Sequence, residues 1–156
     1  MRMIALTCSA GGHLSEMRQL DFFYAQHKHF FITFKRPDTE SLAKKERVFF
    51  IERPARNIVK TLQAFVTAWK ILSRERPRLI ISTGADVTVP VCVAGKLLGI
   101  RILFIESFCR PETPGWTGRI LGWFADYVVY QWSDLKKYYP SGIYSGSIFS
   151  AREGNV

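Results

Sequence analysis

The sequence predicts one α/β domain, residues 1–156, built on a doubly wound parallel sheet of the Rossmann-like kind. Short apolar runs alternate with segments of helical periodicity along the chain, and no two runs are joined by a tight hairpin turn. The length of 156 residues is typical of a single domain, and 47% hydrophobic residues supply enough apolar material for its core. These features exclude a disordered chain and a coiled coil.

The first third of the chain begins with a strand, a glycine turn and a helix. Residues 3–8 are apolar and end before a pair of glycines, after which apolar side chains recur at helical spacing as far as Phe23. Strands are expected at 29–34 and 48–51. The polar, basic stretch 35–45 between them is interpreted as a solvated, mobile loop.

The middle of the chain predicts a long helix, a strand and an apolar helix. Asn57 is expected to cap the long helix, which ends before Pro77. Its apolar residues recur on one face, which we expect to pack mainly in the core: Ile58, Leu62, Phe65, Val66, Trp69 and Leu72. A strand at 79–82 and a nearly all-apolar helix at 87–98 follow.

The last third continues the alternation of strands and helices. A strand at 102–105 precedes a helix that starts at Thr113 and Pro114 and runs through Phe124. A strand at 127–131 and a short helix at 134–139 complete the regular structure. The tail that follows is rich in serine and glycine.

Charge and cysteine content narrow the kinds of ligand. The formal net charge is +9, so nucleic acid, anionic lipid headgroups and phosphorylated ligands are all candidate partners. Cys8, Cys92 and Cys109 include no CxxC pair, which predicts reduced thiols and no metal site. The longest apolar run, 87–98, is shorter than a membrane-spanning helix, and the N-terminus does not resemble a signal peptide.

The turn after the first strand is the strongest candidate for chemistry. In parallel sheets of this kind, ligands bind beyond the carboxyl ends of the strands. Gly11 and Gly12 let backbone N–H groups approach a phosphate at the start of a helix. A tight turn alone would explain these glycines, but it would not explain His13. The spacing excludes both the dinucleotide fingerprint and the Walker loop.

Two further turns end at the same predicted edge of the sheet. Gly84 and Asp86 follow one strand, and we interpret Asp86 as a helix cap, with contact to a ligand hydroxyl as the alternative. Glu106 and Ser107 follow the next strand, where the carboxylate could orient His13 or take a proton. Taken alone, a surface glutamate at the end of a strand is the simpler interpretation.

Two helices combine tryptophan with basic residues. Core packing explains most of their apolar side chains, but this combination is also typical of proteins that lie on anionic bilayers. The candidate membrane contacts are Trp69, Lys70, Arg74, Trp116, Arg119 and Trp123.

With these turns in order, the chain resembles the N-terminal, acceptor-side half of GT-B glycosyltransferases. GGH at 11–13, RPRLIISTGADVTVPVCVAGKLLGI at 76–100 and the Glu106 turn before PGWTGRILGWFADYV are similar to the peptidoglycan enzyme MurG. CSAGGHLSEM at 8–17 is closer to the acceptor-side subunits of dolichol-pathway N-acetylglucosamine transferases. It is also similar to their bacterial counterparts in capsule and exopolysaccharide synthesis.

This resemblance implies an inverting reaction in which an acceptor hydroxyl displaces UDP from a UDP-sugar. His13 would assist the acceptor hydroxyl, and Glu106 would support His13 or act as the base. The acceptor would be a polyprenyl-diphosphate-linked saccharide whose diphosphate faces backbone in the first turn. Its candidate contacts are Ser9, Ala10, Gly11, Gly12, Glu16, Gly84, Asp86 and Ser107. No metal and no cofactor on this chain alone are expected.

The resemblance also implies a heterodimer, because the UDP-sugar-binding half of such two-subunit enzymes is a separate polypeptide. The tail from about residue 141 is the expected contact with that partner, through Ile143, Tyr144, Ile148 and Phe149. Without an N-terminal anchor, the subunit is expected to be peripheral, at the cytoplasmic face of the plasma membrane.

Two other classes of function remain open from the sequence. The chain could be a scaffold that holds the catalytic subunit at the membrane, with His13 and Glu106 structural. It could also be a basic module that binds nucleotides or nucleic acid, given 14% aromatic residues. Most of the aromatics fall in strands or helix stripes, where burial is the simpler use, so nucleic acid is the less favoured partner.

Overall fold

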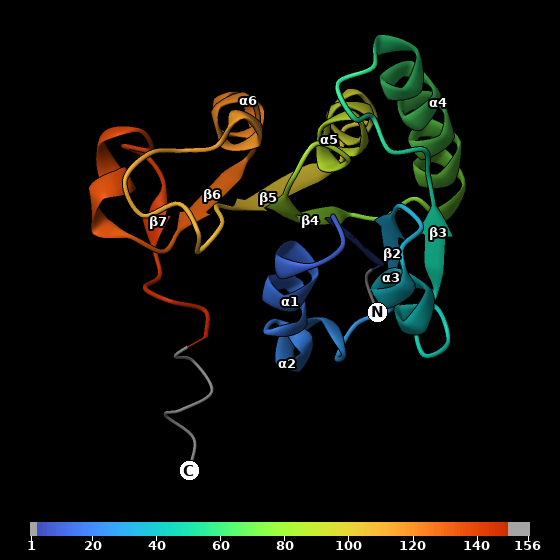
Figure 1. Ribbon diagram of the computed structural model, residues 1–156, viewed down its shortest axis with the longest axis horizontal. Helices are drawn as coiled ribbons and strands as arrows, with labels where there is room; N and C mark the ends of the chain where they lie inside the picture. The colour runs from blue at the N-terminus through green and yellow to red at the C-terminus, as the bar shows by residue number, and fades with distance from the viewer. Residues whose placement is uncertain (1–2, 150–156) are drawn as a thin grey trace.

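Seven parallel strands form one sheet in the computed structural model, which describes residues 3–149 (Figure 1). The order across the sheet is β3-β2-β1-β4-β5-β6-β7. The strands are β1 (Ile4–Cys8), β2 (His29–Thr33), β3 (Val48–Phe50), β4 (Leu79–Gly84), β5 (Arg101–Ile105), β6 (Tyr127–Tyr130) and β7 (Ile143–Tyr144). The predicted doubly wound parallel sheet is confirmed.

Helices cover both faces of this sheet (Figure 1). One face carries α1 (Gly12–Arg18), α2 (Asp21–Tyr24) and α3 (Pro37–Leu42), and the other carries α4 (Ile58–Glu75), α5 (Thr88–Leu97) and α6 (Trp116–Phe124). A 3-10 helix, η1 (Ser133–Lys137), precedes β7. Successive residues of β1 point to opposite faces, so Leu6 packs with α1 while Ala5 packs with α4 and α5.

The order of the strands reverses between β1 and β4. From β1 the chain moves outward through β2 and β3, and then returns to β4 on the other side of β1. Loops that leave the carboxyl ends of β1 and β4 therefore diverge and open a crevice. The turns predicted to carry chemistry begin at this crevice.

The long helix α4 buries a different stripe from the one the sequence predicts. Its buried residues are Ala64, Ala68, Ile71 and Leu72, because small side chains let the helix approach the sheet and α5 closely. Phe65 packs partly against this core. Four of the residues predicted to face the core are instead exposed: Ile58, Leu62, Val66 and Trp69. The prediction for these four is wrong.

The stretch 35–45 is also partly helical, which corrects its interpretation as a loop. Pro37 begins α3, and the Arg36 backbone N–H donates to Thr39 Oγ1 at 2.9 Å. Proline is favoured in the first turn of a helix because its missing N–H has no partner there. The predicted helix after the glycine turn likewise divides into α1 and α2.

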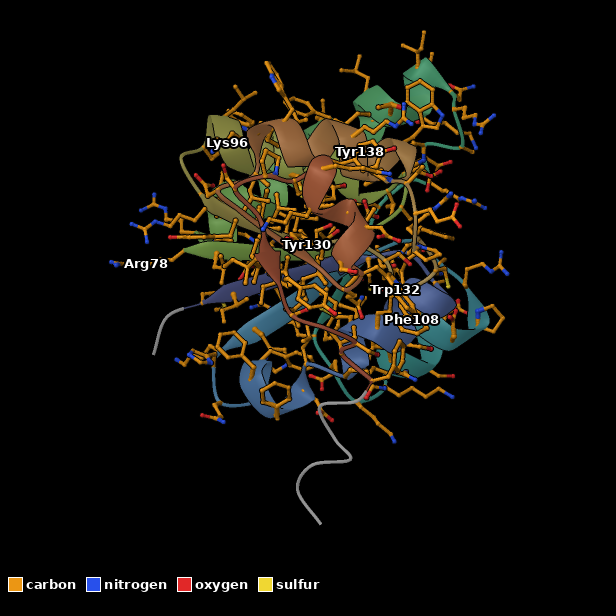
Figure 2. All side chains as sticks on the ribbon, turned by 90° about the vertical axis from the view of Figure 1, so that its left-hand side faces the viewer. Arg78, Lys96, Phe108, Tyr130, Trp132 and Tyr138 are labelled. Carbon is orange, nitrogen blue, oxygen red and sulfur yellow. The ribbon has the colours of Figure 1, made fainter. Side chains whose placement is uncertain are left out.

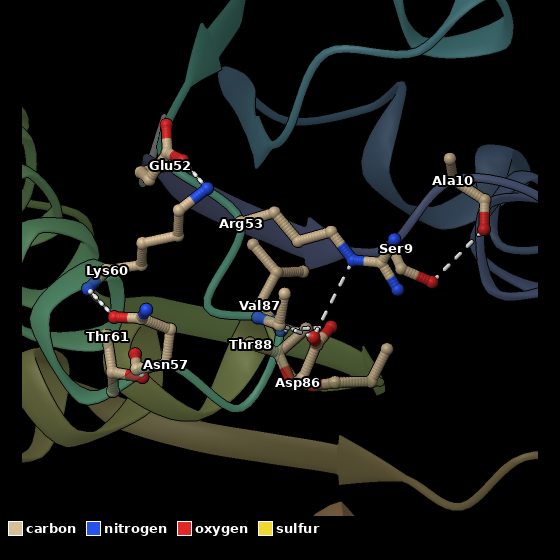
Figure 3. A network of polar contacts seen from close by, with 12 residues as sticks. Ser9, Ala10, Glu52, Arg53, Asn57, Lys60, Thr61, Asp86, Val87 and Thr88 are labelled. Atoms are coloured by element: carbon tan, nitrogen blue, oxygen red, sulfur yellow. Dashed lines mark hydrogen bonds and ion pairs between the residues drawn. The ribbon is translucent and has the colours of Figure 1, made fainter.

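Both ends of α4 follow the sequence prediction. Asn57 Oδ1 accepts the Lys60 backbone N–H at 3.1 Å (Figure 3), and Arg76 ends the helix in the left-handed conformation, φ 48°, before Pro77. Within residues 3–149, no helix has the length and apolar character needed to span a bilayer.

Candidate functional site

One ring nitrogen of His13 forms a hydrogen bond that fixes the ring, and the other can accept a proton. It lies in the first turn of α1, and its Nδ1 is 2.7 Å from the carbonyl oxygen of Thr83 at the end of β4. A carbonyl oxygen only accepts hydrogen bonds, so Nδ1 carries the proton and neutral His13 presents Nε2 as an acceptor. The Thr83 hydroxyl donates in return to the His13 backbone oxygen at 2.8 Å.

The pKa of His13 is lowered from its ordinary value. Burial is the largest cause, because it disfavours the charged imidazolium, and the Thr83 carbonyl and the Glu106 carboxylate oppose it. A position at the positive end of a helix would favour a neutral His13 for a different reason. Burial supplies the reason instead, and it leaves His13 able to accept a proton near neutral pH.

Glu106 is a buried carboxyl rather than the surface residue of the simpler sequence interpretation. Only 3% of its surface is exposed. Its Oε2 accepts the Tyr139 hydroxyl at 2.5 Å, and its Oε1 accepts the Ser107 backbone N–H at 3.1 Å. Burial raises its pKa, while the hydrogen bond from Tyr139 has the opposite, smaller effect.

Helix α6 reaches this carboxyl because two of its residues are glycines. A Cβ at Gly118 would lie 1.9 Å from Glu106 Oε2 and 2.6 Å from the Tyr139 hydroxyl oxygen. A Cβ at Gly122 would lie 2.6 Å from the Tyr139 ring. Tyr139 was not predicted as a site residue, although two glycines four positions apart on a helix indicate such a close approach.

His13 and Glu106 line one pocket of about 790 Å³ at the carboxyl edge of the sheet. Gly84 belongs to the same pocket and packs against His13, since a Cβ there would lie 3.5 Å from His13 Cε1. Asp86 and Ser107, two of the candidate acceptor contacts, also line it. The lining residues that sequence reasoning missed include Arg56, Arg110, Thr117 and Ile120.

The glycine turn borders a second, smaller pocket of about 450 Å³ on the other side of His13 and Asp86. Ser9, Ala10 and Gly11 line this pocket, and the Ser9 hydroxyl donates to the Ala10 backbone oxygen at 3.1 Å. The Gly11 N–H donates to Asp38 Oδ2 at 2.7 Å. A carboxylate of α3 therefore occupies a donor that the resemblance implies for the acceptor's diphosphate.

Asp86 ties the turn after β4 to the loop before α4. Its carboxylate accepts the backbone N–H of Val87 at 2.9 Å and of Ala55 at 3.2 Å, and lies 3.7 Å from Arg53 Nε (Figure 3). Ala55 and the next residue, Arg56, both have positive φ, 46° and 60°. Asp86 thus holds a strained loop. Its interpretation as a helix cap is wrong, because Val87 is the N-cap residue of α5 and no side-chain hydrogen bond caps that helix.

Glu16 differs from its predicted place among the acceptor contacts. Neither pocket is lined by its side chain, which is 3% exposed. Its Oε1 accepts the Ser107 hydroxyl at 2.8 Å and the Phe108 N–H at 3.0 Å, and burial raises its pKa. Among residues 3–149, Oε2 has no hydrogen-bond partner. Glu16 fastens the loop after Glu106 to α1.

The predicted membrane contacts lie on the face of α4 and α6. Trp116 is 78% exposed and Trp123 is 89% exposed, and half-exposed Trp69 lies on the apolar outer side of α4. Lys70, Arg74 and Arg119 are exposed on the same two helices. The structure therefore leaves an apolar and basic surface on this face of the sheet.

The predicted partner contacts lie at the edge of the sheet and after it. Ile143 and Tyr144 form β7 and are more than half exposed. Phe149 packs against Phe108, with ring centroids 5.4 Å apart, and Phe108 in turn contacts Trp132 (Figure 2). The Ile148 N–H donates to Gln131 Oε1, and Gln131 Nε2 donates to the Glu106 backbone oxygen. The start of the tail is thus connected to the site.

Two of the three cysteine thiols are buried and one is exposed. Cys8 and Cys92 are buried, which raises the pKa of each to about 12, and Cys109 is exposed in the turn after Glu106. The described part of the chain contains no group of three or more His, Cys, Asp or Glu residues that could hold a metal ion.

Known structures share this fold. MurG of Acinetobacter baumannii superposes with a TM-score of 0.74 at 18% identity, covering 86% of this chain and 43% of that one. UDP-N-acetylglucosamine 2-epimerase of Rickettsia bellii superposes with a TM-score of 0.80 at 14% identity, covering 97% of this chain and 46% of that one. The predicted likeness to one half of such proteins is confirmed for the fold.

The sequence relatives of this chain include transferases and transferase subunits. The human UDP-N-acetylglucosamine transferase subunit ALG14 is 36% identical over 97 residues, 58% of this chain and 45% of the relative. The pyrophosphoryl-undecaprenol N-acetylglucosamine transferase of Staphylococcus haemolyticus is 36% identical over 86 residues, 55% of this chain and 23% of the relative. The chain thus spans less than half the length of these curated relatives.

A family match covers the chain from the end of β3 to the tail, and it leaves out His13 and the glycine turn. Residues 50–148 match the family described as "Oligosaccharide biosynthesis protein Alg14 like", and they include Asp86, Glu106 and Tyr139. The match extends over more than half of the 156 residues. The chain belongs to the family of Alg14-like oligosaccharide biosynthesis proteins.

Proposed function

We propose that this chain is the acceptor-side subunit of a two-component inverting glycosyltransferase. It would bind a polyprenyl-diphosphate-linked saccharide and recruit a partner subunit that holds the UDP-sugar. The observation that carries the proposal is the pocket lined by both the buried Glu106 and His13, whose Nδ1 is bonded to Thr83 so that Nε2 can accept a proton. The printed names of the relatives, transferase subunits and transferases, support the class of reaction.

In this reaction, His13 acts as the base. Its Nε2 accepts the proton of the acceptor hydroxyl while that oxygen forms a bond to the anomeric carbon of the sugar. The bond from this carbon to the UDP oxygen breaks, UDP leaves with the electron pair, and the anomeric configuration inverts. Glu106 faces the same pocket and stabilises the imidazolium that forms, because a nearby negative charge favours the protonated ring.

The partner subunit is proposed to dock at β7 and the tail that follows it. The outer edge of β7 is the end of the sheet, and Ile143 and Tyr144 expose apolar surface there. Exposed edge strands with apolar side chains favour association with another chain. The UDP-sugar is proposed to lie on the partner, facing the pocket of His13.

The exposed face of α4 and α6 is proposed to lie on an anionic membrane at the cytoplasmic side of the plasma membrane. Tryptophans and aliphatic side chains would enter the interface, and the neighbouring basic residues would meet lipid headgroups. Trp116 belongs both to this surface and to the site pocket, so an acceptor could reach His13 from the bilayer.

One observation favours a second function, that of a scaffold without catalytic chemistry. The reciprocal hydrogen bonds between His13 and Thr83 join α1 to β4, which is a structural use of this histidine. The two functions are separated by His13→Ala in the presence of the partner, with complex formation and turnover measured on the same sample.

For a catalytic His13 we expect turnover to fall by about 10² to 10⁴ while the complex stays intact. If the chain is only a scaffold, we expect turnover and complex formation to change together in His13→Ala, or neither to change. His13→Gln is the matched control, because its amide can still donate to the Thr83 carbonyl but is not a base.

A further inference from the structure

Two guanidinium groups line the site pocket without a protein partner. Arg56 comes from the strained loop before α4, and Arg110 from the turn after Glu106. Among residues 3–149, neither side chain forms a hydrogen bond or an ion pair. Arg53, which comes from the same loop as Arg56, is instead engaged with Asp86.

Among residues 3–149, neither carboxylate of the same pocket forms an ion pair with these two guanidinium groups. Glu106 already accepts from Tyr139 and from the Ser107 N–H, and Asp86 accepts two backbone N–H groups. The charge of Arg110 lowers the pKa of both His13 and Glu106, so the guanidinium lies within electrostatic reach of the two groups. The pocket is therefore prepared for an anion beside His13.

The glycine turn is a less suitable place for that anion. The Gly11 N–H is bound to Asp38, and the small pocket there contains Asp38 and Asp86 opposite Arg36 and Arg53. A diphosphate placed on the Gly11 N–H would have to displace the Asp38 carboxylate, whereas Arg56 and Arg110 have no such partner among residues 3–149.

An apolar groove continues from the site pocket. It has a volume of about 340 Å³ and is lined by residues of α4 and α5: Ile58, Thr61, Leu62, Phe65, Val89, Pro90 and Val93. Thr61, Val89 and Pro90 line both the groove and the site pocket. A ligand that joins an anionic head to a hydrocarbon chain matches this arrangement, whereas a nucleotide would leave the groove unfilled.

We propose that Arg56 and Arg110 hold the diphosphate of the lipid-linked acceptor, and that its lipid chain enters the groove between α4 and α5. This inference rests on the function proposed above and names the phosphate ligands of that site. Guanidinium groups bind phosphate oxygens through paired N–H donors, which gives both charge and direction. The diphosphate then lies across His13 from the glycine turn.

Calorimetric titration of the full chain with farnesyl diphosphate tests this placement. We expect binding by the wild type, and a weakening of roughly 10- to 100-fold for Arg56→Gln and for Arg110→Gln, since each removes hydrogen bonds to a charged group. Arg110→Lys should retain part of the affinity. Arg36→Gln, which removes a positive charge beside the glycine turn, is the matched control and should bind like the wild type.

Two further titrations test whether the bound diphosphate belongs to a lipid or a nucleotide sugar, and where it binds. UDP-N-acetylglucosamine should bind the isolated chain more weakly than farnesyl diphosphate, and its tighter binding would overturn the assignment to a lipid. Asp38→Asn should leave the affinity unchanged, because it alters only the glycine turn. Tighter binding of farnesyl diphosphate by Asp38→Asn would place the diphosphate at Gly11 and contradict the proposal.

The proposed function and this inference fail differently. Farnesyl diphosphate that does not bind the wild type at all would contradict acceptor binding itself. Binding that both arginine variants retain unchanged, with native circular dichroism, would leave the acceptor function standing and overturn only the assignment of these two residues.

Discussion

At the scale of single residues, the chemistry depends on which form of His13 is present. Because burial lowers its pKa, its neutral form persists to a pH below the ordinary value of 6.5. We expect turnover by the complex with the partner to be constant near pH 7 and to fall with acidification only below pH 6.5, as His13 gains a proton. Turnover measured from pH 4.5 to 8 checks this expectation.

The Glu106→Gln variant gives this pH profile a sharper test. The Glu106 carboxylate raises the pKa of His13, so its removal should shift the acid limb of the profile to lower pH and reduce turnover. If Glu106 acts only through His13, the double variant should be scarcely slower than His13→Ala. An acid limb that disappears in Glu106→Gln would instead identify Glu106 as the titrating base.

Gly118 offers a test of the packing around Glu106. Glycine to alanine in an exposed helix stabilises by about 1 kcal/mol, but here the new Cβ would meet the Glu106 carboxyl and the Tyr139 hydroxyl. We therefore expect Gly118→Ala to lower the free energy of unfolding, by about 1 to 3 kcal/mol. Chemical denaturation measures it, with exposed Arg119→Ala as the control on the same helix. An unchanged or higher stability would contradict the described approach of α6.

Some site residues could be predicted from the sequence, and others could not. Glu106 follows β5 directly and His13 follows the glycine turn after β1, and parallel strands bring such turns to one edge. Tyr139 reaches Glu106 from η1, and Asp38 reaches Gly11 from α3, in contacts that no local pattern encodes. Glu16 was misplaced because helical spacing does not show whether a side chain points to a pocket or beneath a loop.

At the scale of elements, α4 shows how periodicity can mislead. Its large apolar side chains and its small ones form separate stripes. Hydrophobic periodicity predicts that the stripe of large side chains faces the core. The alanines pack inward because they allow close contact with the sheet and α5, so the larger side chains remain outside. Strands β1 to β6 were predictable because each is an apolar run of the right length between turn signals, whereas β7, with two residues, was not predicted.

The exposed stripe on α4 and α6 leads to a prediction about membranes. Trp116→Ser with Trp123→Ser should lower binding to anionic vesicles by at least about tenfold, because two interfacial tryptophans are lost. Added salt should weaken wild-type binding, since exposed charges are screened over roughly 10 Å at 0.1 M. Vesicle sedimentation measures both effects.

The control for this prediction lies on the opposite face of the sheet. Phe22 on α2 is 61% exposed, and α2 and α6 cover different faces (Figure 1). Phe22→Ser should leave vesicle binding unchanged. Equal binding to neutral and anionic vesicles would contradict the electrostatic part of the prediction.

At the scale of the whole molecule, the parallel sheet places two surfaces around one pocket. The carboxyl edge holds His13 and Glu106, the face of α4 and α6 offers apolar and basic side chains, and β7 leaves an open edge. Acceptor, membrane and partner could therefore meet at one end of the sheet. The sequence predicted these regions separately, but only the fold shows that Trp116 joins the exposed face of α4 and α6 to the pocket.

The most direct test of the proposed function is reconstitution of sugar transfer. A UDP-sugar and a polyprenyl-diphosphate-linked acceptor are incubated with this chain alone, with the UDP-sugar-binding partner alone, and with both. We expect transfer only with both, and loss of transfer when the chain carries His13→Ala. Robust transfer by either polypeptide alone, or full transfer by the complex with His13→Ala, would contradict the account.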